Sequence, residues 1–163
     1  MVYLVMGVSG CGKTTIGKLL AAHLEVPFFD ADNFHPPSNI KKMRSGQPLN
    51  DDDRKPWLKN LSELISDWNN DGGAVLACSA LKKQYRKLLQ NSGDKRFNQI
   101  TFIYLKGTKE LIYDRLMNRN DHYMPPELLD SQFRDLEEPD DSITVDINQD
   151  PESIFGEILK NLS

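Results

Sequence analysis

Apolar residues along this chain fall into short runs that alternate with longer amphipathic stretches. The short runs are followed by glycine or by polar turn residues, as β-strands usually are. They predict five strands, at Val2–Met6, Pro27–Asp30, Ala74–Cys78, Ile100–Leu105 and Ile143–Ile147. Strands that are apolar throughout are typical of a parallel sheet covered on both faces, and their alternation with helices indicates βαβ units. The pattern therefore predicts an α/β fold.

The amphipathic stretches predict the helices that cover this sheet. Apolar residues recur at helical spacing from Ile16 to Leu24 and again from Trp57 to Trp68. Three later stretches repeat the pattern, at 111–116, 128–136 and 154–162. We interpret these apolar stripes as surfaces that face the core.

Two segments interrupt the alternation. Asn33 to Lys55 is rich in proline, asparagine, aspartate and basic residues, and Arg119 to Pro126 is polar with two prolines. Long irregular segments in a compact domain are usually functional or disordered. Within a single domain at 1–163, we therefore predict an acceptor-binding segment at 33–60 and a lid region at 119–133.

Composition and charge exclude several classes of protein. The chain has 163 residues, the size of one domain, and a net charge of −4, so no global positive field attracts nucleic acid or anionic lipid. Two cysteines are too few for a disulfide framework, and no apolar run approaches the roughly 20 residues of a membrane span. We expect a cytoplasmic protein without a nucleic-acid or membrane partner.

The first predicted strand leads into a phosphate-binding motif. Residues 7–14 match GxxxxGK[ST], and a predicted helix follows directly. Glycines let backbone N–H groups curl around an anion, Lys13 reaches the transferring phosphate, and Thr14 ligates Mg²⁺. We predict binding of ATP with Mg²⁺, contacted by Gly7, Ser9, Gly10, Cys11, Gly12, Lys13, Thr14 and Thr15.

Other motifs favour a kinase over a GTPase switch or an ATPase motor. The sequence contains neither NKxD nor DxxG, and the third strand ends without the aspartate that many ATPases carry there. Instead, Asp30 and Asp32 end the second strand, at the same sheet edge as the phosphate loop. We predict that Asp30 holds a metal-bound water and that Asp32 accepts the proton of an acceptor hydroxyl, so Lys13 and Asp32 are the predicted catalytic residues.

These residues and several further segments resemble the gluconokinases, relatives of shikimate kinase among the P-loop small-molecule kinases. The resemblance runs nearly end to end and is carried by GVSGCGKTT at 7–15, DADNFHPPSNIKKM at 30–43, PLNDDDRKPWL at 48–58, ACSALKKQYR at 77–86 and HYMPPELLDSQFRDLEEP at 122–139. It implies a three-layer P-loop NTPase fold with strand order 2-3-1-4-5. It also implies Mg²⁺-dependent phosphorylation of D-gluconate by ATP to 6-phospho-D-gluconate, in gluconate utilisation feeding the pentose phosphate pathway, and it suggests a homodimer.

Gluconate is an open-chain polyol with one carboxylate, so its site needs a cationic fork and several hydrogen-bonding groups. The predicted acceptor-binding residues are Asp32, His35, Arg44, Arg54, Ser79, Lys82, Arg86 and Gln132. Arg54 and Arg86 are the leading carboxylate ligands, with an ordinary solvated helix charge as the alternative for each. His35 either bonds an acceptor hydroxyl or, beside two prolines, only shapes its loop.

Arg115 and Arg119 lie four residues apart at the start of the predicted lid. We predict that Arg119 brings positive charge to the phosphates and that Arg115 contacts ATP, either at a phosphate or beside the adenine. Two other functions stay open at this point. One is a kinase of another small hydroxy acid such as shikimate, and the other is a nucleotide-binding regulatory module without turnover.

Overall fold

The fold comes from a computed structural model, which describes residues 1–91, 98–118 and 126–162. Its centre is a parallel sheet of five strands in the order β2-β3-β1-β4-β5. The strands are β1 (Val2–Met6), β2 (Phe28–Asp30), β3 (Ala74–Ala77), β4 (Ile100–Lys106) and β5 (Ile143–Asp146). The predicted α/β fold and strand order are confirmed, and each strand lies within one residue of its predicted bounds.

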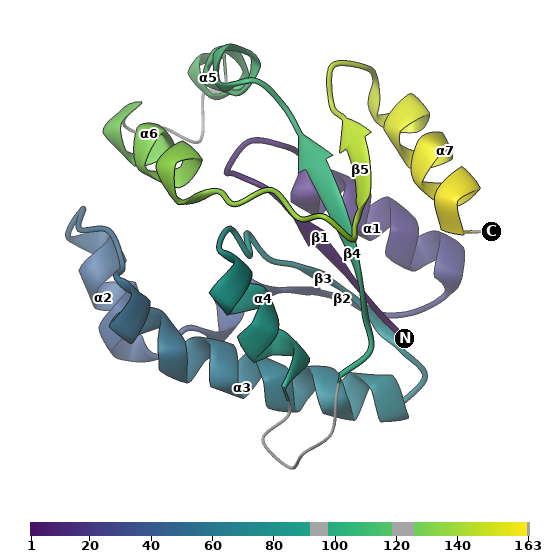
Figure 1. The fold of residues 1–163 in the computed structure, drawn as a ribbon, viewed down its shortest axis with the longest axis horizontal. Helices are drawn as coiled ribbons and strands as arrows, with labels where there is room; N and C mark the ends of the chain where they lie inside the picture. The colour runs from purple at the N-terminus through teal and green to yellow at the C-terminus, as the bar shows by residue number, and fades with distance from the viewer. Residues whose placement is uncertain (92–97, 119–125, 163) are drawn as a thin grey trace.

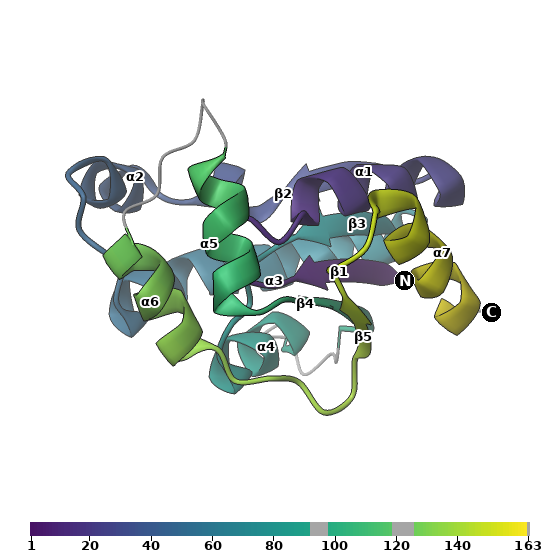
Figure 2. The same ribbon diagram turned by 90° about the horizontal axis from the view of Figure 1, so that it is seen from above.

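Helices cover both faces of the sheet and give three layers (Figures 1 and 2). One face carries α1 (Lys13–Leu24), α5 (Lys109–Met117) and α7 (Pro151–Leu162), whose buried side chains pack with those of β1, β4 and β5. The other carries α3 (Asp51–Asn70) and α4 (Lys83–Gln90). The apolar stripes predicted from the sequence are therefore core-facing surfaces.

The predicted irregular stretch from Asn33 to Lys55 is wrong in part, because most of it is helical. It contains the end of a 3₁₀ turn η1 (Ala31–Phe34), helix α2 (Pro37–Arg44) and the first turn of α3. Helix α2 has few apolar residues and so shows no stripe, although a proline at its first turn is a usual start signal. Helix α3 begins with a capping box between Asn50 and Asp53, and asparagine and aspartate are also common in loops, which is why the composition of this segment predicts an irregular one.

Helix α6 (Pro126–Asp135) follows the predicted lid loop in sequence and packs against α5, where Lys109 forms an ion pair with Asp130. Residues 119–125 of the predicted lid lie outside the described residues, and its remainder, 126–133, forms most of α6. Figure 2 shows α2 and α6 at the end of the molecule far from the chain termini. In the described ranges, no helix has the length and apolar character needed to span a bilayer.

Candidate active site

The phosphate loop connects β1 to α1 and depends on glycine for its shape. Gly7, Gly10 and Gly12 have φ angles of 147°, 85° and 100°, which residues with a side chain rarely adopt. A Cβ on Gly7 would also lie 2.6 Å from the Cys11 sulfur and 3.0 Å from the carbonyl oxygen of Leu105. The loop is therefore fixed by backbone geometry, with Cys11 buried behind it.

Lys13 folds back over this loop. Its Nζ donates hydrogen bonds to the carbonyl oxygens of Gly7 and Val8, both at 3.0 Å, and lies 4.0 Å from the Cys11 sulfur. Thr14 and Thr15 follow in the first turn of α1, and both are exposed. The ammonium group and the Thr14 hydroxyl thus lie at the helix N-terminus, where an anion is favoured.

Two aspartates end β2 at the same edge of the sheet. Asp30 Oδ1 accepts a hydrogen bond from the Asp32 backbone N–H at 3.0 Å, which caps η1 and fixes the Asp30 side chain. The Asp32 side chain is 78% exposed, and its Oδ1 lies 3.7 Å from Nε2 of His35. The approach of the His35 ring lowers the pKa of Asp32, and the charge of Lys13 acts in the same direction.

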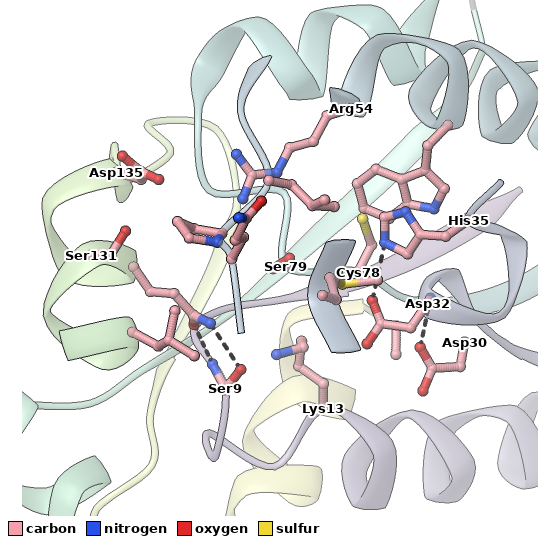
Figure 3. Close-up of a pocket in the computed structure, with 18 of the residues that line it drawn as sticks. Ser9, Lys13, Asp30, Asp32, His35, Arg54, Cys78, Ser79, Ser131 and Asp135 are labelled. Carbon is pink, nitrogen blue, oxygen red and sulfur yellow. Dashed lines mark hydrogen bonds and ion pairs between the residues drawn. The ribbon is translucent and has the colours of Figure 1, made fainter. Parts of the chain in front are cut away.

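A cavity of about 290 Å³ opens beside these groups. That volume is near the lower end of the range for small-molecule sites, about 300–1,000 Å³. Figure 3 shows Lys13 at one end of it, Arg54 at the other, Asp32 and His35 on one side, and Ser131 and Asp135 facing them. The structure brings together eight predicted site residues here, namely Ser9, Lys13, Asp30, Asp32, His35, Arg54, Ser79 and Gln132.

Arg54 is held by Tyr85 of α4. Arg54 Nη1 donates to the Tyr85 hydroxyl at 2.9 Å, and its guanidinium carbon lies 5.4 Å from the centre of the ring. The Tyr85 hydroxyl in turn donates to Asp51, which also accepts from Lys82 Nζ at 3.0 Å. The hydrogen bonds from Tyr85 and Lys82 lower the pKa of Asp51 to about 2. Lys82, predicted at the acceptor, therefore supports this network and does not line the cavity.

Arg86 and Arg44 also lie away from the cavity. Arg86 is 7% exposed, and its guanidinium donates to the backbone carbonyls of Ala80, Leu81 and Glu137 at 2.7, 3.1 and 2.8 Å. Burial lowers the pKa of Arg86. Arg44 is exposed at the end of α2. Four cationic side chains are predicted at the acceptor, and all four lie in the described part of the chain. Of these, only Arg54 lines the cavity.

Gln132 connects α6 to the phosphate loop. Its Oε1 accepts from the backbone N–H of Ser9 at 2.7 Å, and its Nε2 donates to the Ser9 hydroxyl at 3.0 Å, as the dashed lines at Ser9 in Figure 3 mark. Arg115 donates from Nη2 to the carbonyl oxygen of Ile147 at 2.7 Å, which joins α5 to the end of β5. Arg119 lies outside the described residues.

Sequence reasoning missed several residues that line or support the cavity. Trp57 belongs to an apolar stripe that we interpret as core, and no sequence pattern around Tyr85 predicts a role for it. Ser131 and Asp135 could have been found, because 128, 131, 132 and 135 share one face of a helix with the predicted Gln132.

The residues at the loop fit a magnesium ion. The described residues contain no group of three or more histidine, cysteine or acidic side chains that would form a complete protein cage. They do offer the exposed Thr14 hydroxyl and the Asp30 carboxylate at one sheet edge. Mg²⁺ prefers such oxygen ligands and is usually held by one or two carboxylates with waters and substrate phosphates, so this donor set suits it.

Comparisons with known proteins show the family of this chain. The sequence model of the shikimate kinase family matches residues 9–163. A probable gluconokinase of Dictyostelium discoideum is 44% identical over 99% of this chain and 86% of its own length. The thermoresistant gluconokinase of Escherichia coli (strain K12) is 40% identical over 98% of this chain and 91% of its own length.

Solved structures agree with these matches. A crystal structure of a gluconokinase from Sinorhizobium meliloti 1021 superposes with a TM-score of 0.86 at 37% identity, and the match covers 99% of this chain and 90% of that one. A shikimate kinase from Aquifex aeolicus superposes with a TM-score of 0.61 at 20% identity, over 99% of this chain and 96% of that one, and so shares the fold.

Proposed function

This chain belongs to the gluconokinases, within the shikimate kinase family of P-loop kinases, and we propose that it transfers the γ-phosphoryl group of ATP to D-gluconate. The products are 6-phospho-D-gluconate and ADP. The observation that supports this reaction best is a single cavity with Lys13 of the phosphate loop at one end and Arg54 at the other. Such a cavity offers one end to a phosphate and the other to the carboxylate of an open-chain acid.

The chemistry needs little more than positioning and charge. The acceptor hydroxyl oxygen forms a bond to the γ-phosphorus, and the bond from that phosphorus to the bridging oxygen of ADP breaks. Asp32 takes the hydroxyl proton, because its carboxylate lies in the cavity and a carboxylate is ionised at neutral pH. Lys13 leaves the carbonyls of Gly7 and Val8, which hold it in the free enzyme, and neutralises phosphate charge.

We assign Mg²⁺ to the Thr14 hydroxyl and, through a water, to Asp30. When bound there with ATP, the ion supplies neutralisation of the charge that develops on the phosphate oxygens. Asp30 is suited to hold such a water, because its Oδ1 already accepts a hydrogen bond from the Asp32 N–H and the carboxylate is thereby oriented.

Arg54 is the proposed ligand of the gluconate carboxylate. It is the cation that lines the cavity among the four predicted, and the Tyr85 hydroxyl and ring hold its guanidinium in place. A planar guanidinium binds a carboxylate through two parallel hydrogen bonds, which a lysine does not reproduce. Ser79, Ser131 and Asp135 line the same cavity and supply polar groups for the hydroxyls of the chain.

Arg115 is proposed to contact ATP beside the adenine, since it already orders the chain after β5 through Ile147.

Arg119 stays a prediction for the phosphates, and the homodimer stays a prediction that light scattering in solution would test. We propose that the reaction takes place in the cytoplasm, where ATP is available and the two free cysteines remain reduced.

An ADP-release assay with Mg²⁺ and ATP tests the function directly. The acceptors are gluconate, shikimate, glycerate and glucose, a neutral analogue of gluconate. We expect turnover with gluconate and little with glucose, because glucose leaves the Arg54 guanidinium without a carboxylate. Equal turnover of shikimate would instead indicate a kinase of another hydroxy acid. Binding of ATP without turnover of any acceptor would indicate a regulatory nucleotide-binding module.

A further inference from the structure

Three polar side chains form a line that ends at the proposed base. Asn39 of α2 lies between the backbone carbonyl of Asp53 and the ring of His35, and His35 lies between Asn39 and Asp32. Asn39 and His35 are 4% and 8% exposed, so water does not satisfy these groups in place of the contacts. The direction of each hydrogen bond along the line is therefore determined by its neighbours.

The Asp53 carbonyl fixes which way the Asn39 amide points. A carbonyl oxygen only accepts hydrogen bonds, so the group that faces it at 2.9 Å must be the NH₂ of Asn39. The reversed amide would place two oxygens against each other in a buried site. The same NH₂ group lies 3.2 Å from Nδ1 of His35 and has a second hydrogen for it.

The orientation of Asn39 selects the tautomer of His35. Because Asn39 donates to Nδ1, this nitrogen must accept and carries no hydrogen. The ring hydrogen then lies on Nε2, the nitrogen that faces Asp32 Oδ1 at 3.7 Å. Figure 3 shows this ring beside Asp32, at the wall of the cavity.

The ring itself has little freedom to turn. It stacks on the indole of Trp57 with 4.1 Å between ring centres and 19° between their planes. The indole is fixed in turn, because its Nε1 donates to the backbone carbonyl of Ala31 at 2.8 Å. Ala31 stands between Asp30 and Asp32, so the stack and the two aspartates share one local framework.

We propose that His35 is a positioning residue for Asp32, which Asn39 holds in the Nε2–H tautomer, and not a ligand of the acceptor. This inference rests on the proposed role of Asp32 in phosphoryl transfer. At 3.7 Å the pair is beyond hydrogen-bond length, and we expect Nε2–H to donate to Oδ1 when substrates fill the cavity, since catalytic hydrogen bonds often tighten in the working complex. The bond then turns the exposed Asp32 carboxylate toward the acceptor hydroxyl.

The tautomer can be measured without any turnover. In the ¹⁵N-labelled unliganded protein, a long-range ¹H–¹⁵N spectrum distinguishes the protonated ring nitrogen from the bare one. The chain has three histidines, and the His35→Gln variant identifies the signals that belong to His35. We expect Nδ1 bare and Nε2 protonated. A hydrogen on Nδ1 would overturn the proposal.

A matched pair of variants tests the positioning role. In His35→Gln the side-chain amide reaches the place of Nε2, whereas in His35→Asn it reaches only that of Nδ1. Both lose the stack on Trp57 equally. We expect His35→Asn to lower kcat on the order of 10- to 100-fold with little change in the KM for gluconate or ATP. His35→Gln should retain most of kcat.

Other outcomes would each contradict the proposal. An equal loss of kcat in both variants would mean that the ring only supports the fold, and a raised KM for gluconate at normal kcat would make His35 an acceptor ligand. If both variants fail to fold, Asn39→Leu keeps the ring, and we expect it to mix the two tautomers and to lower kcat. A single Nε2–H tautomer retained in Asn39→Leu would show that Asn39 does not set it. Failure of the unsubstituted protein to phosphorylate gluconate would refute the proposed function, and the spectrum would still decide the tautomer.

Discussion

The phosphate loop and the opposite wall of the cavity are built in different ways. The loop is one contiguous segment. Its shape requires the positive φ angles of its glycines and leaves no room for a side chain at Gly7. The opposite wall depends on side chains from separate helices, with Arg54 of α3 held by Tyr85 of α4 and Asp135 contributed by α6. A site formed by one backbone segment can be recognised in the sequence as a motif. A site formed by side chains that are distant in the sequence can be recognised only once the fold is known.

Asp32 lies where the two regions meet, and its removal should have the largest effect. Asn keeps the shape of the side chain but cannot take the proton of the acceptor hydroxyl. We expect Asp32→Asn to lower kcat by about 10²–10⁴-fold, while the Kd for ATP stays near its original value. Single-turnover kinetics and nucleotide titration measure the two quantities. Near-normal turnover would remove Asp32 from the mechanism.

A substitution in the backbone-built region should damage nucleotide binding. In Gly7→Ala the new methyl group meets the Cys11 sulfur and the Leu105 carbonyl at a φ of 147°, and strain of about 1–3 kcal/mol is expected. That strain corresponds to about 5- to 150-fold in the Kd for ATP if the loop relaxes into a different shape. Gly72→Ala is the matched control, because Gly72 also has positive φ but no atom within 4 Å of the new methyl group. Similar Kd values for the two variants would contradict the close-contact explanation.

A substitution in the wall built from side chains should change acceptor affinity alone. Arg54→Met removes the proposed carboxylate ligand, and we expect the KM for gluconate to rise about 10- to 100-fold, from the loss of about 1.5–3 kcal/mol in charged hydrogen bonds. The KM for ATP should stay constant. Arg44→Met, at an exposed site outside the cavity, is the control. An equal effect of the two substitutions would argue against Arg54 as the carboxylate ligand.

The smallest expected effect concerns Asp51, which binds the Tyr85 hydroxyl that holds Arg54. Folding lowers the pKa of Asp51 from 3.8 to about 2, so its ionised form stabilises the folded protein above pH 3.8 and the contribution is lost as the pH falls toward 2. The Asp51 side chain is 44% exposed, and the gain should stay below about 1 kcal/mol. The difference in unfolding free energy between the parent and Asp51→Asn, measured in urea, should shrink over this range. A difference that stays constant over this range would contradict the stabilising role of the ionised Asp51.

The sequence allowed the sheet and the phosphate loop to be predicted because both are encoded locally. Continuous apolar runs mark buried parallel strands, and the loop motif specifies its own geometry. Helix α2 was missed because a short helix whose residues are mostly polar carries no periodic signal.

Arg54 and Arg86 could not be separated from the sequence, since each is a cation near the same edge of the sheet. Only the fold shows that Arg86 binds three backbone carbonyls, whereas Arg54 faces the cavity. His35 is a similar case. The proposed function of the His35 ring depends on its contacts with Asn39 and with Trp57, which lies 22 positions after His35 in the sequence.

The two hydrogen bonds between Gln132 and Ser9 connect α6, which lines the acceptor cavity, to the phosphate loop. Both ends of the Gln132 amide are used on the phosphate loop, so any ligand that displaced α6 from its place at the acceptor cavity would break contacts at the ATP site. The free energy of binding one substrate then depends on whether the other is bound. By thermodynamic reciprocity, the factor by which gluconate changes the affinity for ATP equals the factor by which ATP changes the affinity for gluconate.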